Sequence, residues 1–297
     1  MATRALPAFV TAALVVCAAS LLTGATARQP APAALKDALT FHSPFDEGTS
    51  AAFALGDPRL YAAVSRNEAA RAADGAPATA IEPVAGGRYG GAARIRLGPT
   101  PFVFYRGERN VAWQPRDWSG TVSFWMSLDP DRDLAPGYSD PLIVTSRDWN
   151  DGSFFVDFTR DDVPRRFRFA AFADRGVWDP ARRDWDAVPV PERPMVELRG
   201  PLFGRGRWTH VAWTWSRFNT GAADGLLTCY IDGRAVGTLA GRTQTYSWDP
   251  REVTIALGVQ FVGLIDDLAI FNRALDAEDI AVLHGMAGGV AGLGAGR

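Results

Sequence analysis

The sequence predicts an all-β domain, built as a two-sheet antiparallel β-sandwich with one short C-terminal helix. Three observations carry this prediction: short runs in which apolar and polar side chains alternate, enrichment of those runs in aromatic and β-branched residues, and Gly, Pro, Asp and Asn between them. A period of two with unlike faces is typical of half-buried strands. Many such runs with almost no helical periodicity indicate a sandwich or a barrel.

Six runs are expected to be strands. In residues 121–128, Val122, Phe124 and Met126 share one face, whereas Ser123 and Trp125 share the other. This alternation predicts that the first set faces a core. The remaining expected strands are 153–159, 166–172, 209–215, 226–232 and 253–257.

The single helix is expected near the C-terminus. Asp276 is a suitable N-cap, and Asp279 three residues later completes a capping-box-like start. Ile280 and Leu283 follow at helical spacing, and Gly285 is expected to end the helix.

The chain ends divide the sequence into four parts. Residues 1–27 have a short basic start, an apolar stretch and a small-x-small site, which together predict a signal peptide cleaved after Ala27. Residues 28–36 are expected to be a linker, 37–285 the folded domain and 286–297 a flexible tail. The mature chain is therefore predicted to be secreted, periplasmic or in the cell envelope, without a membrane span.

Charge and cysteine content restrict the partners and the means of stabilisation. The formal net charge is −2, and cleavage removes one further positive charge, Arg4. Such a chain has no long-range field to hold nucleic acid. Cleavage also leaves Cys229 without a disulfide partner, so the 47% hydrophobic content must stabilise the domain through a core.

Five blocks carry a resemblance to a known family. They are Phe-Asp-Glu-Gly at 45–48, Gly-Thr-Val-Ser-Phe-Trp at 120–125, Trp-Thr-His-Val-Ala-Trp at 208–213, Cys-Tyr-Ile-Asp-Gly at 229–233, and the run 261–275. In this order the sequence resembles the laminin-G-like jelly-roll family of the concanavalin A-like lectin and glucanase superfamily, over residues 41–284. The resemblance implies a jelly roll that binds glycans or proteins, often with calcium, while some relatives cleave polysaccharides.

Tryptophans in polar loops are the candidate ligand contacts. The resemblance leaves residues 172–207 as an insertion, and its length indicates a functional or mobile segment. Trp178 and Trp185 lie there among Asp and Arg, and Trp149 lies in another polar loop. An indole in such a loop either packs into a neighbouring gap or contacts a ligand such as a carbohydrate.

Two acidic sets are candidates for a structural calcium ion. One offers four carboxylates at calcium-loop spacing, although the same residues suit a solvated turn: Asp129, Asp131, Asp133 and Asp140. The resemblance implies the second set, Asp46 and Asp266, where the first and last strands meet.

Catalysis has one candidate arrangement. If Arg168, His210 and Tyr230 lie on one concave sheet face, they suit a polysaccharide lyase, with Arg neutralising a uronate and His or Tyr moving the proton. The alternative is that His210 is an ordinary half-buried strand residue. The paired-carboxylate pattern of a retaining glucanase is absent from the sequence.

The sequence therefore favours an exported, non-catalytic binding module for glycans or glycoproteins. Two alternatives remain. One is a protein-interaction or scaffolding module of the cell envelope, which binds an extracellular protein; the other is the polysaccharide lyase, or less specifically a hydrolase.

Overall fold

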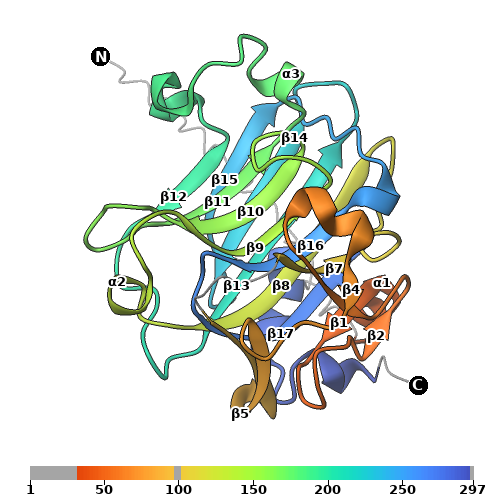
Figure 1. Cartoon of the computed structure of the whole chain (residues 1–297). Helices are drawn as coiled ribbons and strands as arrows, with labels where there is room; N and C mark the ends of the chain where they lie inside the picture. Colours follow the sequence, from red (N-terminus) through yellow and green to blue (C-terminus); the bar gives the residue numbers. More distant parts are fainter. Residues whose placement is uncertain (1–31, 97–101, 295–297) are drawn as a thin grey trace, which may run out of the picture.

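The computed structural model describes residues 32–96 and 102–294, and within them two antiparallel sheets pack face to face (Figure 1). Sheet A has nine strands in the order β15-β14-β13-β8-β17-β1-β2, with the β5–β6 hairpin attached to β17. Its strands are β1 (Leu39–Ser43), β2 (Phe53–Ala54), β5 (Ile81–Tyr89), β6 (Gly91–Ile95), β8 (Trp118–Ser127), β13 (Thr209–Phe218), β14 (Gly225–Ile231), β15 (Arg234–Arg242) and β17 (Gly263–Phe271). The expected β-sandwich is confirmed.

Sheet B has eight strands in the order β12-β11-β10-β9-β16-β7-β3-β4. They are β3 (Leu60–Ala63), β4 (Ala73–Asp74), β7 (Phe102–Arg106), β9 (Ser139–Thr145), β10 (Ser153–Phe158), β11 (Phe167–Phe172), β12 (Met195–Leu198) and β16 (Thr254–Val259). Sheet neighbours such as β8 and β17 lie far apart in sequence, so the chain crosses repeatedly between the sheets, as a jelly roll does.

The helices of the described chain are short. The α-helices are α1 (Pro32–Ala38), α2 (Pro130–Asp133), α3 (Arg175–Trp178) and α4 (Ala277–Gly285). The 3₁₀ helices are η1 (Arg66–Arg71), η2 (Trp185–Ala187), η3 (Val190–Glu192), η4 (Pro250–Glu252) and η5 (Val290–Leu293). Among the described residues, none of these helices has the length and apolar character needed to cross a bilayer.

The core lies between the two sheets and follows the predicted alternation. Val122, Phe124 and Met126 of β8 face it, as do Val211 and Trp213 of the paired strand β13. Side chains that alternate in this way present one apolar face, whose burial contributes about 25 cal/mol per Å² of apolar surface.

Aromatic side chains fill one end of this core. The Trp118 ring is fully buried, and its centroid lies 5.0 Å from that of Trp215 and 5.0 Å from that of Trp248. Edge-to-face contacts of this kind add to the burial of the rings. Trp213 and Trp215 are therefore structural, as their strand positions predict.

The outer face of sheet A is closed by the two chain ends. Leu35 of α1, Ile280 of α4 and Val290 of η5 pack in one buried cluster with Ala212 and Tyr230 of the sheet. The capping box at Asp276 is confirmed, because its side chain accepts hydrogen bonds from the Glu278 and Asp279 backbone amides.

Ordered structure extends beyond the expected domain limits at both ends of the described chain. Residues 32–36 were expected in a linker, but they belong to α1, where Leu35 is buried. Residues 290–293 were expected in a loose tail, but they form η5, where Val290 and Leu293 are buried. Short apolar segments order here because the sheet supplies the surface on which they pack. The expected signal peptide, 1–27, lies outside the described residues.

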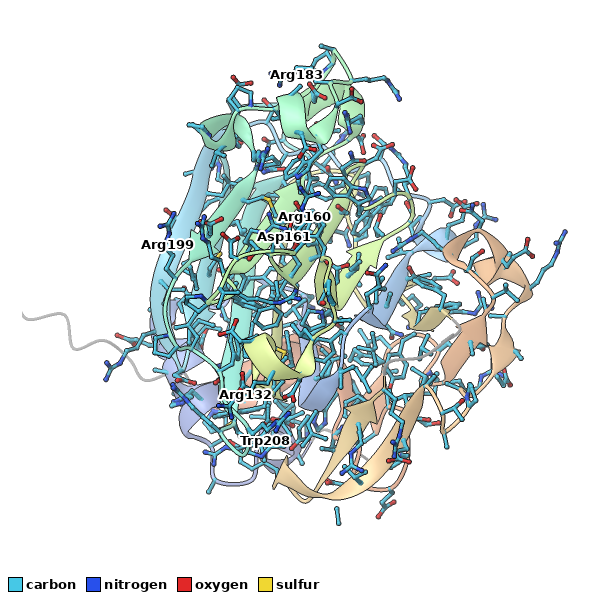
Figure 2. All side chains as sticks on the ribbon, turned by 60° about the vertical axis from the view of Figure 1, so that its left-hand side comes forward. Arg132, Arg160, Asp161, Arg183, Arg199 and Trp208 are labelled. Atoms are coloured by element: carbon cyan, nitrogen blue, oxygen red, sulfur yellow. The ribbon has the colours of Figure 1, made fainter. Side chains whose placement is uncertain are left out.

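The outer face of sheet B is covered in part by two segments. One is η1; the other is the ordered excursion from the end of β11 to β12, whose outermost part carries Arg183 (Figure 2). Phe172, Trp178 and Trp185 pack in one cluster on this face. The excursion ends in β12, an edge strand, which agrees with its proline-rich sequence. Between the two segments a cavity reaches the outer face of the sheet.

Candidate functional site

A cavity of about 290 Å³ lies on the outer face of sheet B, between η1 and the excursion. Such a volume is at the lower end of the range of small-molecule sites, about 300–1,000 Å³. We call it the central cavity, and the lining residues that matter here are Arg66, Asp140, Trp149, Asp157, Arg168 and Trp185.

A buried ion pair forms part of its wall. Asp157 of β10 lies directly opposite Arg168 of β11. Both oxygens of Asp157 accept hydrogen bonds from Arg168, one of them from Nε at 2.8 Å and the other from Nη2. Burial raises the pKa of Asp157, whereas Arg168 lowers it. Because the two-pronged geometry satisfies both groups, neither is left free to bind or to react.

Asp140 is different because its carboxyl group forms no hydrogen bond or ion pair with the described residues. Two residues of β9, Asp140 and Pro141, lie opposite the single residue Asp157, which makes a β-bulge. The bulge brings Asp140 to the cavity. Burial raises the pKa of Asp140 well above its ordinary value, and Asp157 adds to the rise while Arg168 and Arg66 oppose it.

Arg66 is the second polar group without a partner. It begins η1, its guanidinium carbon lies 4.9 Å above the Phe102 ring, and its Nη1 is buried without a hydrogen bond. Buried polar atoms are rarely left unsatisfied in folded proteins. Arg66 and Asp140 therefore mark the cavity as a place where a polar ligand or water completes the hydrogen bonding.

Two of the three predicted tryptophans line the central cavity. The rings of Trp149 and Trp185 meet edge to face at 5.3 Å, and 41% of the Trp149 residue surface is exposed. The Arg193 guanidinium covers Trp185 at 4.2 Å. Trp178 instead packs edge to face on Phe172. Its Nε1 donates to the Asn150 carbonyl at 2.8 Å, so Trp178 supports the loop that holds Trp149.

The residues of the lyase arrangement do not converge. Arg168 lies on sheet B, whereas His210 and Tyr230 lie on sheet A beneath the elements that close its outer face. The ring of His284 from α4 stacks on Trp125 and lies 5.6 Å from that of His210. Burial lowers the pKa of His210 to about 3, so the imidazole is neutral near pH 7. His210 is a structural residue, and its Nε2 bonds Ser123.

Asp46 and Asp266 lie at one hairpin, as the resemblance implies. Asp46 accepts a hydrogen bond from the Gly91 amide at 2.6 Å, and Asp266 accepts one from the Tyr89 amide at 2.9 Å. The other oxygen of Asp266, Oδ1, is buried without a partner. Burial raises the pKa of Asp266 to about 7, since its charged form is poorly solvated.

A calcium ion fits this place in part. Oδ1 of Asp266 suits a hard cation, and calcium takes about six to eight oxygens. The described residues contain no group of three or more His, Cys, Asp or Glu side chains that could hold a metal. Asp46 and Asp266 would thus supply the charge, and backbone carbonyls and water the remaining ligands.

The acidic loop fits calcium poorly because its carboxylates are already used. Asp133 accepts from Arg205 Nε at 2.8 Å, and Asp131 accepts from the Arg165 amide at 2.7 Å. Asp129 precedes α2 without a side-chain capping bond, and its Oδ2 lies 3.6 Å from Nε of Arg132. Asp140, which the sequence grouped with them, lies in the central cavity instead.

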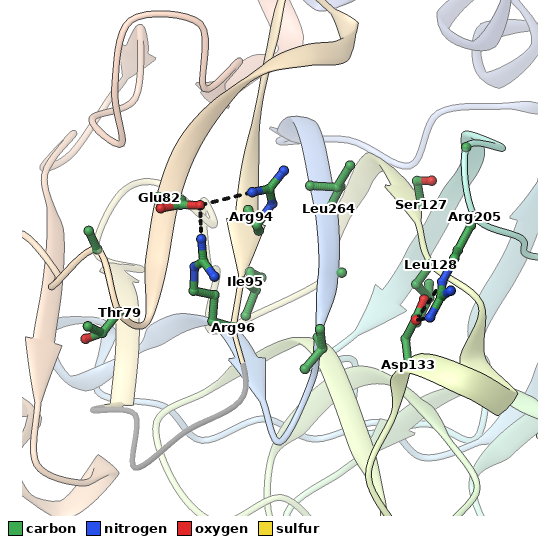
Figure 3. A pocket seen from close by; sticks show the side chains of 14 residues that line it. Thr79, Glu82, Arg94, Ile95, Arg96, Ser127, Leu128, Asp133, Arg205 and Leu264 are labelled. Carbon is green, nitrogen blue, oxygen red and sulfur yellow. Dashed lines mark hydrogen bonds and ion pairs between the residues drawn. The ribbon is translucent and has the colours of Figure 1, made fainter.

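A wider hollow, of about 1070 Å³, lies beside β6, β8 and β17 (Figure 3). Glu82 accepts hydrogen bonds from both Arg94 and Arg96 on one side, and Asp133 pairs with Arg205 on the other. Because these charges satisfy one another, the hollow presents fewer unmet polar groups than the central cavity.

Sequence reasoning missed Arg66 and the true neighbours of Asp140. Pro141 within an otherwise regular strand was an available signal, because proline inside a sheet marks an edge or a bulge. No pattern in the sequence joins Arg66 to this site, since η1 reaches it from 74 positions before Asp140.

The comparisons with known proteins concern the family and the fold. The model of the concanavalin A-like lectin/glucanases superfamily matches residues 108–281. A search of curated proteins found no match. The binding domain of Paraclostridial Mosquitocidal Protein 1 has a TM-score of 0.52 and 14% identity, over 84% of this chain and 52% of that one. The chain thus spans about half of the length of that domain.

Two further solved structures have lower scores. Domain 4 of AbnA, a GH43 extracellular arabinanase from Geobacillus stearothermophilus, in complex with arabinotriose, gives a TM-score of 0.49 at 18% identity, over 82% of this chain and 97% of that one. The botulinum neurotoxin serotype G binding domain gives 0.42 at 12% identity, over 76% and 50%. At these identities the likeness concerns the fold alone.

Proposed function

The chain belongs to the concanavalin A-like lectin/glucanases superfamily, and from this premise we propose that it is an exported, non-catalytic binding module for glycans or glycoproteins. Its ligand lies in the central cavity. One observation carries the proposal: two indole rings border a cavity that is also lined by the carboxyl group of Asp140 and by Arg66, whose buried Nη1 has no hydrogen-bond partner.

The composition of the cavity suits a carbohydrate. A sugar ring has apolar faces that pack on indoles and hydroxyls that need both donors and acceptors. Trp149 and Trp185 supply the aromatic surface, Arg66 supplies donors, and Asp140 supplies an acceptor or, when protonated, a donor. A purely apolar ligand would leave Arg66 and Asp140 without hydrogen-bond partners.

A binding role agrees better with this chemistry than catalysis does. Asp157 is held by Arg168, so it is not free to act as a second carboxylate beside Asp140. The lyase arrangement is separated between the two sheets. Export rests on the signal-peptide pattern of residues 1–27.

The test is a panel of purified polysaccharides and glycoproteins presented to the full chain, with and without calcium. We expect binding to at least one carbohydrate and no release of shortened products or unsaturated ends. Loss of that binding in Asp140→Ala, with an unchanged melting temperature, places the ligand in the central cavity. Absence of binding to every carbohydrate, together with specific co-purification of an envelope protein, would favour the scaffolding alternative and refute this proposal.

A further inference from the structure

The central cavity has a neighbouring cavity on each side. On one side it shares Tyr138, Arg168 and Met195 with a cavity of about 480 Å³, which we call the arginine cavity. The arginine cavity lies at the ends of β10, β11 and β12 and is bordered by Arg160 and Arg199. Because the two cavities share these wall residues, they lie next to each other on this face of the sheet.

On the other side the central cavity shares Arg66 and Asp148 with a cavity of about 520 Å³. We call this one the η1 cavity, and it is bordered by Asn67 of η1 and by Arg106 of β7. The three cavities together follow the outer face of sheet B from the β10–β11 turn to η1 and β16. A row of neighbouring cavities of this kind suits several consecutive units of a long chain.

The free charges along this face balance. Among the described residues, three arginines and three acids that border the cavities form no ion pair: Arg66, Arg106, Arg193, Asp140, Asp148 and Glu252. The other charged side chains are paired, as Arg160 is with Asp161 at 2.6 Å. A balanced surface has no net attraction for a polyanion. It offers instead separate donors and acceptors.

Arg66 and Asp140 offer a ligand complementary hydrogen-bonding groups. A guanidinium only donates hydrogen bonds, whereas a carboxylate only accepts them. A sugar hydroxyl does both, so a hydroxyl or a vicinal pair can accept from Arg66 and donate to Asp140. A ligand carboxylate or sulfate would pair with Arg66, but the carboxylates of Asp140 and Asp148 in the same cavity would repel it.

We propose that this face binds an internal segment of an uncharged polysaccharide, with one sugar in the central cavity and its neighbours in the arginine and η1 cavities. The inference rests on the proposed glycan-binding function and adds the charge class and the chain length of the ligand. It also specifies that neither end of the polymer is needed for binding.

The test uses isothermal titration with a ladder of uncharged oligosaccharides, taken from the polymer that binds best in the panel. Affinity should rise at least about tenfold between one and three sugars, because each added unit brings new contacts. It should change less than about twofold between low and high salt, since no net charge is neutralised. Capping both ends of a long oligosaccharide should leave its affinity unchanged.

Matched variants locate the outer subsites. Arg199→Ala removes an exposed side chain of the arginine cavity, and Asn67→Ala removes one of the η1 cavity. Arg132→Ala is the control, because Arg132 is similarly exposed on the separate α2 turn (Figure 2). Each outer variant should weaken long oligosaccharides about two- to tenfold, the range of one lost hydrogen bond, while leaving the single sugar unchanged.

Three results would overturn the inference while keeping the proposed function. The first is full affinity for a single sugar, and the second is a requirement for a free chain end. The third is a preference for polyanionic polymers with strong salt dependence. If no carbohydrate binds at all, the proposed function itself fails, and the ladder identifies that case at its first step.

Discussion

Trp178 and Trp185 lie within eight residues of each other, yet the structure gives them different roles. Trp185 borders the central cavity, whereas Trp178 fastens a loop to the sheet. We therefore expect Trp185→Ala to weaken carbohydrate binding and Trp178→Ala to lower stability. The sequence alone made both of them candidate ligand contacts, with packing as the alternative.

The magnitude for Trp178 follows from three contacts. Its hydrogen bond to Asn150 is worth about 1 kcal/mol, its edge contact with Phe172 about 0.5–1.5 kcal/mol, and the Arg175 guanidinium 4.9 Å above its ring about 0.5–1 kcal/mol. Together they amount to about 2–3.5 kcal/mol. In a domain of this size the melting temperature should fall by roughly 5–10 °C.

Trp185→Ala removes a ring that only partly belongs to the fold. Stacking one sugar on an indole contributes about 1–3 kcal/mol, by analogy with base–aromatic stacking, so binding should weaken about 5- to 150-fold. Calorimetric titration measures this loss, and Trp185→Phe is the control because it keeps an aromatic face. The reasoning is wrong if Trp178→Ala abolishes binding without lowering the melting temperature, or if Trp185→Ala binds as the unchanged protein does.

Three further predictions concern buried groups on sheet A. At pH 8 with a chelator present, Asp266→Asn should be more stable than the wild type by up to about 4 kcal/mol. The folded pKa of Asp266 is about 7, so the stability that its protonated carboxyl contributes is lost as the pH rises through that value. The contribution of His210 to stability has the opposite sign. Because its folded pKa is near 3, the wild type loses stability as the pH falls below about 6.5. The melting temperature of His210→Gln should therefore decline less steeply in acid than that of the wild type. Calcium should raise the melting temperature of the wild type by a few degrees but not that of Asp266→Asn, and an unchanged wild-type melt with calcium and with chelator excludes Asp46 and Asp266 as a metal site.

Much of the fold was predictable because local pattern and tertiary packing agree. In β8 and β13 the alternation specifies which side chains enter the core, and in α4 the capping box specifies the first turn. The short segments α1 and η5 were missed because their order depends on sheet A rather than on their own sequences. A seven-residue helix has little stability alone.

The site was predictable only in part. Trp149 and Trp185 stood out as indoles in polar loops, and both border the central cavity. Alternation correctly separated the two faces of each strand, but it carries no information on which sheet a strand joins. A shared face for Arg168 and His210 was therefore compatible with the sequence, although their strands lie in different sheets.

The difference between the two outer faces explains why the ligand site is expected on sheet B. On sheet A, α1, α4 and η5 bury apolar side chains against the sheet, and a ligand would have to displace them. On sheet B the excursion and η1 pack at the two sides and leave polar groups between them, where the bulge at Asp140 and the start of η1 at Arg66 meet. Substitutions in η1 and the excursion therefore change this outer face without entering the core, since the opposite faces of the same strands form the core.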